Sequence, residues 1–440
     1  MTIKQKNRLI FLIYALILGA FIGLLTWIFL RSISFGTEMI WSYLPAKIDF
    51  IYLPILICMI GGVFVGLCQK YFGNVPGVLS IELEEIKKTK RVDYKNLPAV
   101  AISSFLPLIF GASAGPEAAL VSIIGGLSTW IADHIKATAD TVKAFTEIGA
   151  AATLGAMFGS PFFGYAKTFE ERKGSNLLST QSDKTKEIVI EMDDEIFPKN
   201  AKRIIYFAAA LAGFGTFAVL SYFFPESGIY RYEYMPYGLN EWLLLLPLAV
   251  VGGLFGNLYY ISGIFIRKGI QPIKNHKVLL AVAGGFVLGA VGMILPYTMF
   301  SGEAQIAEIF AEWTSLSVIV LILTAILKIF VTRFCFLTGW RGGHIFPIIF
   351  SGLVLGYAAA SLLPADPTFC ALVCSAAMTC MVLRKPVAIV FLFLVICPIH
   401  YLIPLGIAAF IGILMPFPKI FEHAEEEEIA EELKRMKRAA

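Results

Sequence analysis

Long apolar runs separated by short charged loops dominate this sequence. The runs 9–30, 50–71 and 204–224 each supply about the ~20 apolar residues that an α-helix needs to cross a bilayer. Soluble proteins of this length carry about 25% charged residues, whereas 15% of these 440 residues are charged and 58% are hydrophobic. The sequence therefore predicts an all-α, polytopic membrane protein.

Basic residues cluster in the loops between the apolar runs. They mark the N-terminus, the loops 73–96 and 267–277, the linker 170–203 and the C-terminal tail. The positive-inside rule places these segments, and so both termini, in the cytoplasm, and the lysine-free loop 225–241 outside. We expect a cytoplasmic N-terminus (1–8), a first membrane half (9–171), a cytoplasmic linker (172–203), the remaining membrane segments with the second half (204–418) and a cytoplasmic tail (419–440).

One apolar run, 97–131, is interrupted by the stretch 111–116. Gly115-Pro116 indicates a helix start, because proline fits the first helical position, where a backbone N–H has no partner within the helix. A helix that begins at membrane depth directs unpaired N–H groups and the positive end of its dipole into a low-dielectric interior. Such an end attracts anions, and interrupted helices at mid-bilayer mark substrate sites in transporters. This stretch indicates an anion pathway.

A second half of the chain repeats this order of features. In the first half, the small-residue helix 149–161 ends in a proline some 45 residues after Pro116. In the second half, the stretch 342–347 opens an apolar helix, and Pro386 follows 39 residues after Pro347. Paired interruptions at matching places predict an inverted repeat with a site at the repeat interface. The alternative is that glycine and proline are simply frequent in membrane helices.

Four of these stretches resemble the CLC family of chloride channels and proton-coupled chloride exchangers. Their sequences are GAAATLGAMFGSPFFGYAKTFEE (149–171), LKIFVTRFCFLTGWRGGHIFP (327–347), ASAGP (112–116) and GNVP (73–76). No single motif is intact, but all four occur in the family's order and spacing. The resemblance implies a CLC-type inverted repeat of broken and tilted helices, one anion path per subunit, chloride or a related anion as substrate, and a homodimer.

The chain departs from the family at positions that control transport. The family's gating glutamate falls on Ala114, which carries neither proton nor charge, and its central serine falls on Gly73, with Asn74 beside it. The late tyrosine that closes the inner mouth has no counterpart in the segment 415–418. The sequence therefore identifies a divergent branch, whose gating need not follow that of its relatives.

Backbone dipoles are suitable ligands for chloride, because conduction needs an ion held weakly enough to be released. The expected anion ligands are Gly73, Asn74, Ser113, Ala114, Gly115, His344, Ile345 and Phe346. For most of them we expect the backbone N–H to be the donor, with the amide of Asn74 in addition. The alternative for each group is a satisfied helix cap.

Two glutamates are candidates for a gate or for proton transfer. Glu117 is at the start of its helix, where a carboxylate can simply stabilise the dipole, but an ionisable group inside a membrane is a functional hypothesis by default. Glu117 would then compete with the anion and replace the missing gate. Glu171 matches the internal proton-transfer glutamate of the exchangers. Its alternative is an ordinary helix end at the cytoplasmic surface.

Passive, channel-like conduction of chloride or a related anion is the first functional prediction, because Ala114 removes the usual coupling glutamate. The alternative is proton-coupled anion exchange through Glu117 and Glu171, and a less favoured one is a permease for a small organic solute. No nucleophile–base pair, metal set or cofactor motif indicates an enzyme. The net charge of +4 is too small and dispersed to indicate nucleic acid. The expected location is a prokaryotic inner or plasma membrane, with lipid around the protein.

Overall fold

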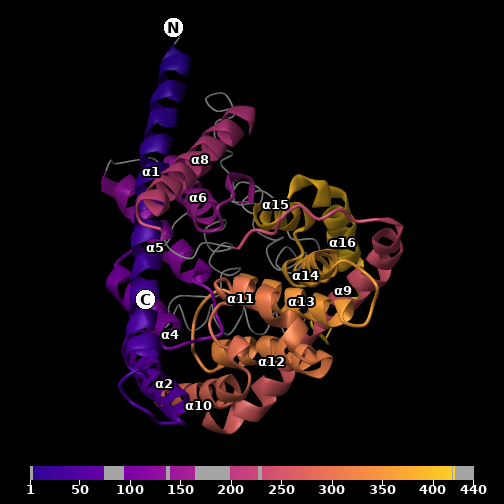
Figure 1. Cartoon of the computed structure of the whole chain (residues 1–440). Coiled ribbons are helices and arrows are strands. Elements are labelled where there is room, and N and C mark those ends of the chain that lie inside the picture. Colours follow the sequence, from indigo (N-terminus) through magenta and orange to yellow (C-terminus); the bar gives the residue numbers. More distant parts are fainter. Residues whose placement is uncertain are drawn as a thin grey trace.

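The computed structural model describes residues 3–73, 94–134, 139–163, 199–225, 230–418 and 420–421, and this part of the chain is built from helices (Figure 1). The first half holds α1 (Ile3–Glu38), the π-helical turn η1 (Met39–Tyr43), α2 (Leu53–Phe72), α4 (Leu97–Ile109), α5 (Glu117–His134) and α6 (Ala139–Met157). The remainder holds α8 (Lys199–Phe223), α9 (Leu239–Ile270), η3 (Gln271–Ile273), α10 (Lys277–Ile294), η4 (Pro296–Thr298), α11 (Gln305–Glu312), η5 (Trp313–Ser315), α12 (Val318–Leu337), α13 (Ile345–Ala360), α14 (Pro367–Leu383), α15 (Pro386–Ile396), η6 (Ile399–Tyr401) and α16 (Leu402–Leu414).

Among the described residues, six helices are long and apolar enough to cross a membrane: α1, α2, α8, α9, α10 and α12. Seven further apolar helices are shorter, with 10–17 residues, and include part of α5 and the whole of α13. The predicted mixture of full spans and short pieces is therefore confirmed. The first span is longer than the apolar run 9–30, because α1 continues to Glu38 and into η1.

Helix starts follow from local sequence. A proline occupies one of the first two positions of α2, α4, α14 and α15, where its fixed φ suits the helix and its missing N–H is not needed. At α14 the Asp366 carboxylate also accepts a hydrogen bond from the N–H of Phe369 at 2.7 Å, which caps the helix. The predicted interruption at 111–116 separates α4 from α5, and the predicted interruption at Pro386 separates α14 from α15.

Two short helices, α13 and α14, form the centre of the molecule, with α9, α12 and α16 packed around them (Figure 1). Every residue of α14 after its first proline is buried, and so is α13 as far as Ala358. Both helices are apolar on all sides, as a fully buried helix must be. They approach closely at Gly352, where a Cβ atom would lie 2.4 Å from the Cα of Ser375.

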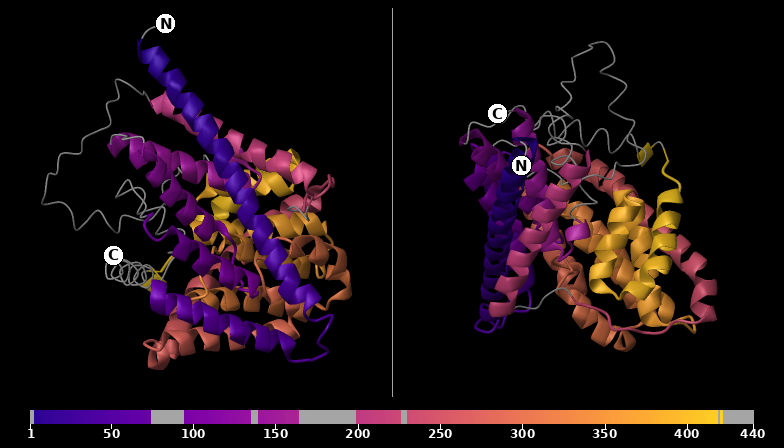
Figure 2. Two further views of the ribbon diagram at one scale, coloured as in Figure 1. Left: turned by 90° about the vertical axis from the view of Figure 1, so that its left-hand side faces the viewer. Right: turned by 90° about the horizontal axis from the view of Figure 1, so that it is seen from above.

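The long helix α1 runs across the molecule and packs along α8, which crosses it at an angle (Figure 2). A second pair, α2 and α10, forms one of the largest helix contacts of the fold. Helices α5 and α6 pack against each other, and α6 also contacts α1 and α8. This arrangement brings the start of α5 and the end of α6 towards the start of α13.

Candidate anion site

The two interrupted segments of the sequence meet through backbone hydrogen bonds. The N–H of Gly115 donates to the carbonyl of Gly343 at 2.8 Å, and the N–H of Gly343 donates to the carbonyl of Gly115 at 2.6 Å. This antiparallel bridge is the one β-type pairing among the described residues. Because α5 begins two residues after Gly115 and α13 begins two residues after Gly343, the N-termini of helices from opposite halves lie side by side.

The carboxylate of Glu117 lies between these helix ends. Its Oε1 accepts a hydrogen bond from the backbone N–H of Phe346, in the first turn of α13, at 3.2 Å. The Glu117 side chain has no exposed surface. A negative group at this place is stabilised by the unsatisfied N–H groups and the dipole of α13. Glu117 therefore occupies a position where a free anion would also be stabilised.

The two bridge glycines make room for this carboxylate. A Cβ atom on Gly115 would lie 2.1 Å from Oε2 of Glu117, and one on Gly343 would lie 1.8 Å from the same oxygen. Real Cβ atoms do not approach other atoms so closely, so any larger residue would displace the carboxylate. Because glycine has no side chain, the Glu117 carboxylate can approach the backbone closely at both positions.

Two of the expected backbone donors are already used. The N–H of Ala114 donates to the carbonyl of Ala112 at 2.8 Å, within a tight turn, and the N–H of Gly115 belongs to the bridge. The expectation that these N–H groups face an anion therefore differs from the observed hydrogen bonding. The reason is local. The turn after α4 and the bridge to the other half use the N–H groups of Ala114 and Gly115 as donors before α5 begins.

Ser113 lies beside the bridge and contacts α12. Its hydroxyl group and that of Thr332 are 2.9 Å apart, and both side chains are fully buried. The Thr332 hydroxyl also donates to the carbonyl of Lys328 at 2.7 Å. Thr332 was not a candidate from the sequence, because a threonine within an apolar helix gives no signal of its own.

The residues that lead into α13 are buried. Ile345 has no exposed surface and starts the helix. The His344 ring lies 5.4 Å from the ring of Tyr259 and 6.2 Å from that of Phe336, measured between centroids. The guanidinium of Arg333 stacks on the Tyr259 ring at 4.4 Å and donates to its hydroxyl at 3.2 Å. A cationic group is thus positioned one aromatic ring away from the start of α13.

Of the remaining sequence candidates, only Gly73 is among the described residues. Gly73 ends α2 with a φ of +82°. One turn earlier, Gln69 packs against Gly339, in the turn that leads from α12 towards α13. Asn74 and Glu171 are outside the described ranges, so their expected roles stay predictions.

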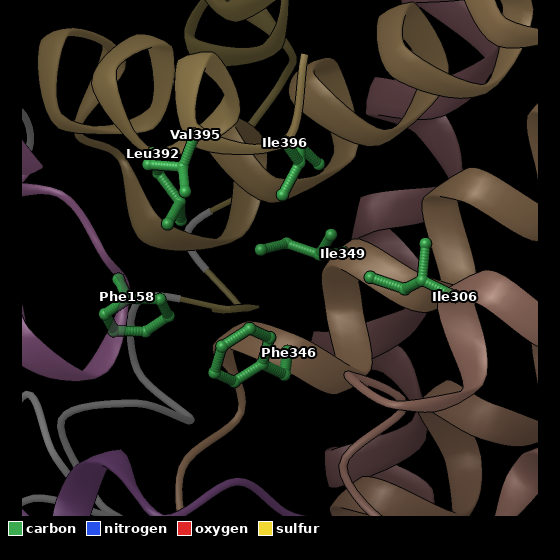
Figure 3. Close-up of a pocket in the computed structure, with 7 residues that line it drawn as sticks. All are labelled: Phe158, Ile306, Phe346, Ile349, Leu392, Val395 and Ile396. Atoms are coloured by element: carbon green, nitrogen blue, oxygen red, sulfur yellow. The ribbon is translucent and has the colours of Figure 1, made fainter. Parts of the chain in front are cut away.

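The side chain of Phe346 also lines an apolar cavity (Figure 3). It is small, and only apolar side chains line it: Phe158, Ile306, Phe346, Ile349, Leu392, Val395 and Ile396. The rings of Phe158 and Phe346 stack with centroids 4.8 Å apart. Phe158 directly follows α6, so the small-residue stretch 149–161 also reaches the α13 tip.

Lys328 supports the site from α12 without contacting an anion position. Its ammonium group is fully buried and donates to the carbonyls of Met299 at 2.6 Å and Phe300 at 2.8 Å. Buried ammonium groups require such partners.

In the described part of the chain, no group of three or more His, Cys, Asp or Glu side chains is arranged to hold a metal ion.

A family model described as "Voltage gated chloride channel" matches residues 61–416. This match includes both segments of the glycine bridge and all described helices from α4 to α16. The chain belongs to the CLC family. As a CLC protein it is a membrane transporter or channel for anions and not an enzyme.

Among its curated relatives, this CLC protein is similar to the "Putative ion-transport protein YfeO" of Escherichia fergusonii, with 23% identity over 384 residues, 84% of each chain. The protein of the same name from Salmonella paratyphi A is 24% identical over 415 residues, 91% of this chain and 93% of that protein. The sequence similarity thus extends over most of both proteins.

Solved structures share the fold of this CLC protein. A slow cyanobacterial Cl⁻/H⁺ antiporter superimposes with a TM-score of 0.75 at 18% identity, over 96% of this chain and 98% of that one. A CLC-type fluoride/proton antiporter gives a TM-score of 0.70 at 16% identity, over 94% and 96% of the two chains. The predicted all-α, CLC-type architecture is confirmed.

Proposed function

We propose that this CLC protein exchanges chloride, or a related small anion, for protons, with Glu117 as the group that both closes the anion path and carries the proton. One observation carries the proposal: Oε1 of Glu117 accepts the Phe346 N–H at the tip of α13. An anion and the ionised carboxylate would compete for this tip. Protonation removes the charge of Glu117, so the side chain leaves and an anion takes its place.

Passive conduction was the first prediction because Ala114 removes the family's gating carboxylate. Glu117 is three residues further along the chain, and its carboxylate nevertheless reaches the bridge between the two halves. This position supports the alternative, proton-coupled exchange. In that scheme Glu171 would deliver protons from the cytoplasmic side. Passive conduction follows instead if Glu117 leaves the tip without passing its proton onward.

Chloride is proposed on the strength of the family and of the antiporters that share the fold. The two curated relatives described above are bacterial, which supports a bacterial plasma membrane. The basic loops support both termini on the cytoplasmic side, and the family supports a homodimer.

The test is to reconstitute the full chain into liposomes and record chloride with an ion-selective electrode and protons with a pH electrode. For the parent we expect an imposed chloride gradient to drive protons uphill. Glu117→Gln cannot bind a proton, so chloride flux should continue with proton movement lost. Glu233→Gln is the matched control, because Glu233 is exposed in the loop before α9.

Each other outcome has a definite meaning. Chloride flux in the parent that never moves protons would establish passive conduction and overturn exchange. Proton movement that survives in Glu117→Gln would remove Glu117 from the mechanism. Uptake of a neutral organic solute without anion flux would favour the permease.

A further inference from the structure

The loop between α10 and α11 is fixed directly beside the candidate site. The N–H of Phe300 donates to the carbonyl of Gly111 at 3.1 Å, which ties the loop to the turn that precedes α5. The buried ammonium of Lys328 holds the carbonyls of Met299 and Phe300 from the opposite side. These three hydrogen bonds connect the loop to both halves of the protein.

The same loop is pressed against α13. Gly302 has a φ of +93°, and a Cβ atom on it would lie 2.7 Å from the Cβ of Phe350. Both properties require glycine at this position. Glu303 follows immediately, and its N–H donates to the hydroxyl of Ser301 at 3.3 Å. The backbone of Glu303 is therefore held next to the helix whose first turn binds Glu117.

Glu303 and Glu117 form a pair of interacting carboxyl groups. Residue Glu303 keeps some exposed surface, while its carboxyl group is buried. Burial, and in addition the negative charge of Glu117, raise the pKa of Glu303 to about 8. Carboxyl groups that are near each other in a low dielectric cannot both ionise easily, so a proton on one of them favours ionisation of the other.

Other charged groups near this loop are already engaged or lie at its outer side. Lys328 is committed to the two carbonyls of the loop. Glu308 and Glu312 are on α11 and exposed, and Glu312 accepts the hydroxyl of Tyr297 at 2.7 Å. Glu303 is thus the acidic group of this loop whose carboxyl is both buried and subject to the charge of Glu117.

We propose that Glu303 is the proton donor and acceptor for Glu117 on the side of the membrane opposite the basic loop 267–277. The O–H bond of the Glu303 carboxylic acid breaks, the proton forms an O–H bond on the Glu117 carboxylate, and the Glu303 carboxylate is reprotonated from the outer water. Protonated Glu117 then releases the α13 tip. This inference rests on the proposed function, in which Glu117 closes the path.

The experiment measures chloride flux in liposomes as the outer pH is varied from 5.5 to roughly 9.5, a range that brackets the pKa of Glu303. For the parent we expect flux to fall by about tenfold per pH unit above about pH 8, because the protonated fraction of a carboxyl group falls at that rate beyond its pKa. Glu303→Gln should lose this dependence and transport at low pH as slowly as the parent does at high pH. Glu303→Asp, which keeps a carboxyl group, should retain a fall with rising pH.

Two further variants separate a relay from a general structural effect. Glu308→Gln, on the adjacent helix and exposed, should keep the parent profile. Glu117→Gln combined with Glu303→Gln should transport like Glu117→Gln alone, since Glu303 acts through Glu117. Size-exclusion profiles of all variants establish that they are folded.

A Glu303→Gln variant with the parent profile would overturn this inference and leave the proposed function standing. So would a double variant that transports much more slowly than Glu117→Gln. A parent that transports no anion, or a Glu117→Gln variant with unchanged proton movement, would overturn the proposed function itself.

Discussion

Glu117 and Phe346 are 229 positions apart in the chain, and the carboxylate of the first accepts the backbone N–H of the second at 3.2 Å. The contact joins a side chain from the first half to a helix end of the second half. Both partners are buried, so no water competes for the hydrogen bond. In the proposed function, this contact decides whether the α13 tip is available to another anion.

The space for this carboxylate can be tested by filling it. Gly343→Ala places a methyl group where Oε2 of Glu117 now lies, since the Cβ would be 1.8 Å from that atom. The end of the Glu117 side chain must move, and we expect proton-coupled chloride transport to change in the same direction as in Glu117→Gln. Flux and proton movement in liposomes are the measurements.

The control for this variant is Gly215→Ala in α8, because a Cβ at Gly215 meets no atom within 4 Å. It should transport like the parent. If Gly343→Ala is folded and also transports like the parent, the contact between the bridge and Glu117 has no role in gating.

The ring of Phe158 supports the α13 tip from the end of α6, stacked on Phe346 and facing the apolar cavity. Phe158→Ala should lower the free energy of unfolding by about 3 kcal/mol, the usual cost of removing a buried phenylalanine ring. Unfolding by denaturant in mixed micelles measures the loss. Phe265→Ala removes a ring that is 68% exposed and should cost much less; equal losses would contradict a packing role for Phe158.

The hydroxyl pair of Ser113 and Thr332 should behave as one unit. Removing one partner, as in Ser113→Ala, leaves the other buried hydroxyl with one hydrogen bond fewer, and we expect a loss of about 1–2 kcal/mol of stability. Ser113→Ala combined with Thr332→Val should cost less than the sum of the two single losses. The same mixed-micelle unfolding experiment measures the cycle, and strictly additive losses would show that the pair is not coupled.

Much of this site follows from the sequence, and the parts that do not have physical reasons. Pro116 and the segment 342–347 predict two helix starts, because proline and glycine restrict the backbone locally. The hydrogen bonds of Ala114 and Gly115 do not follow from the sequence, since they depend on a tight turn and on a partner in the other half. Glu303 gave no signal, because its burial arises only when its loop is pressed against α13.

The pKa of Glu303 also predicts how stability depends on pH. Its folded value of about 8 is above the ordinary value of 4.5, so the unfolded chain releases this proton first as pH rises. The stabilising contribution of the neutral group is complete below about pH 4.5 and is lost progressively up to about pH 8. The melting temperature of the parent should therefore fall relative to that of Glu303→Gln over this interval and run parallel above it. Parallel curves throughout would show that Glu303 titrates normally.

The bridge between Gly115 and Gly343 limits how the molecule can move during transport. Swinging the two repeats apart would break both of its hydrogen bonds in an apolar interior, where each is worth about 4–6 kcal/mol. A rocking-bundle cycle is therefore unfavourable here. We therefore expect the backbone of the bridge to stay in place during turnover, so that the rotation of individual side chains exposes the ion to one side or the other.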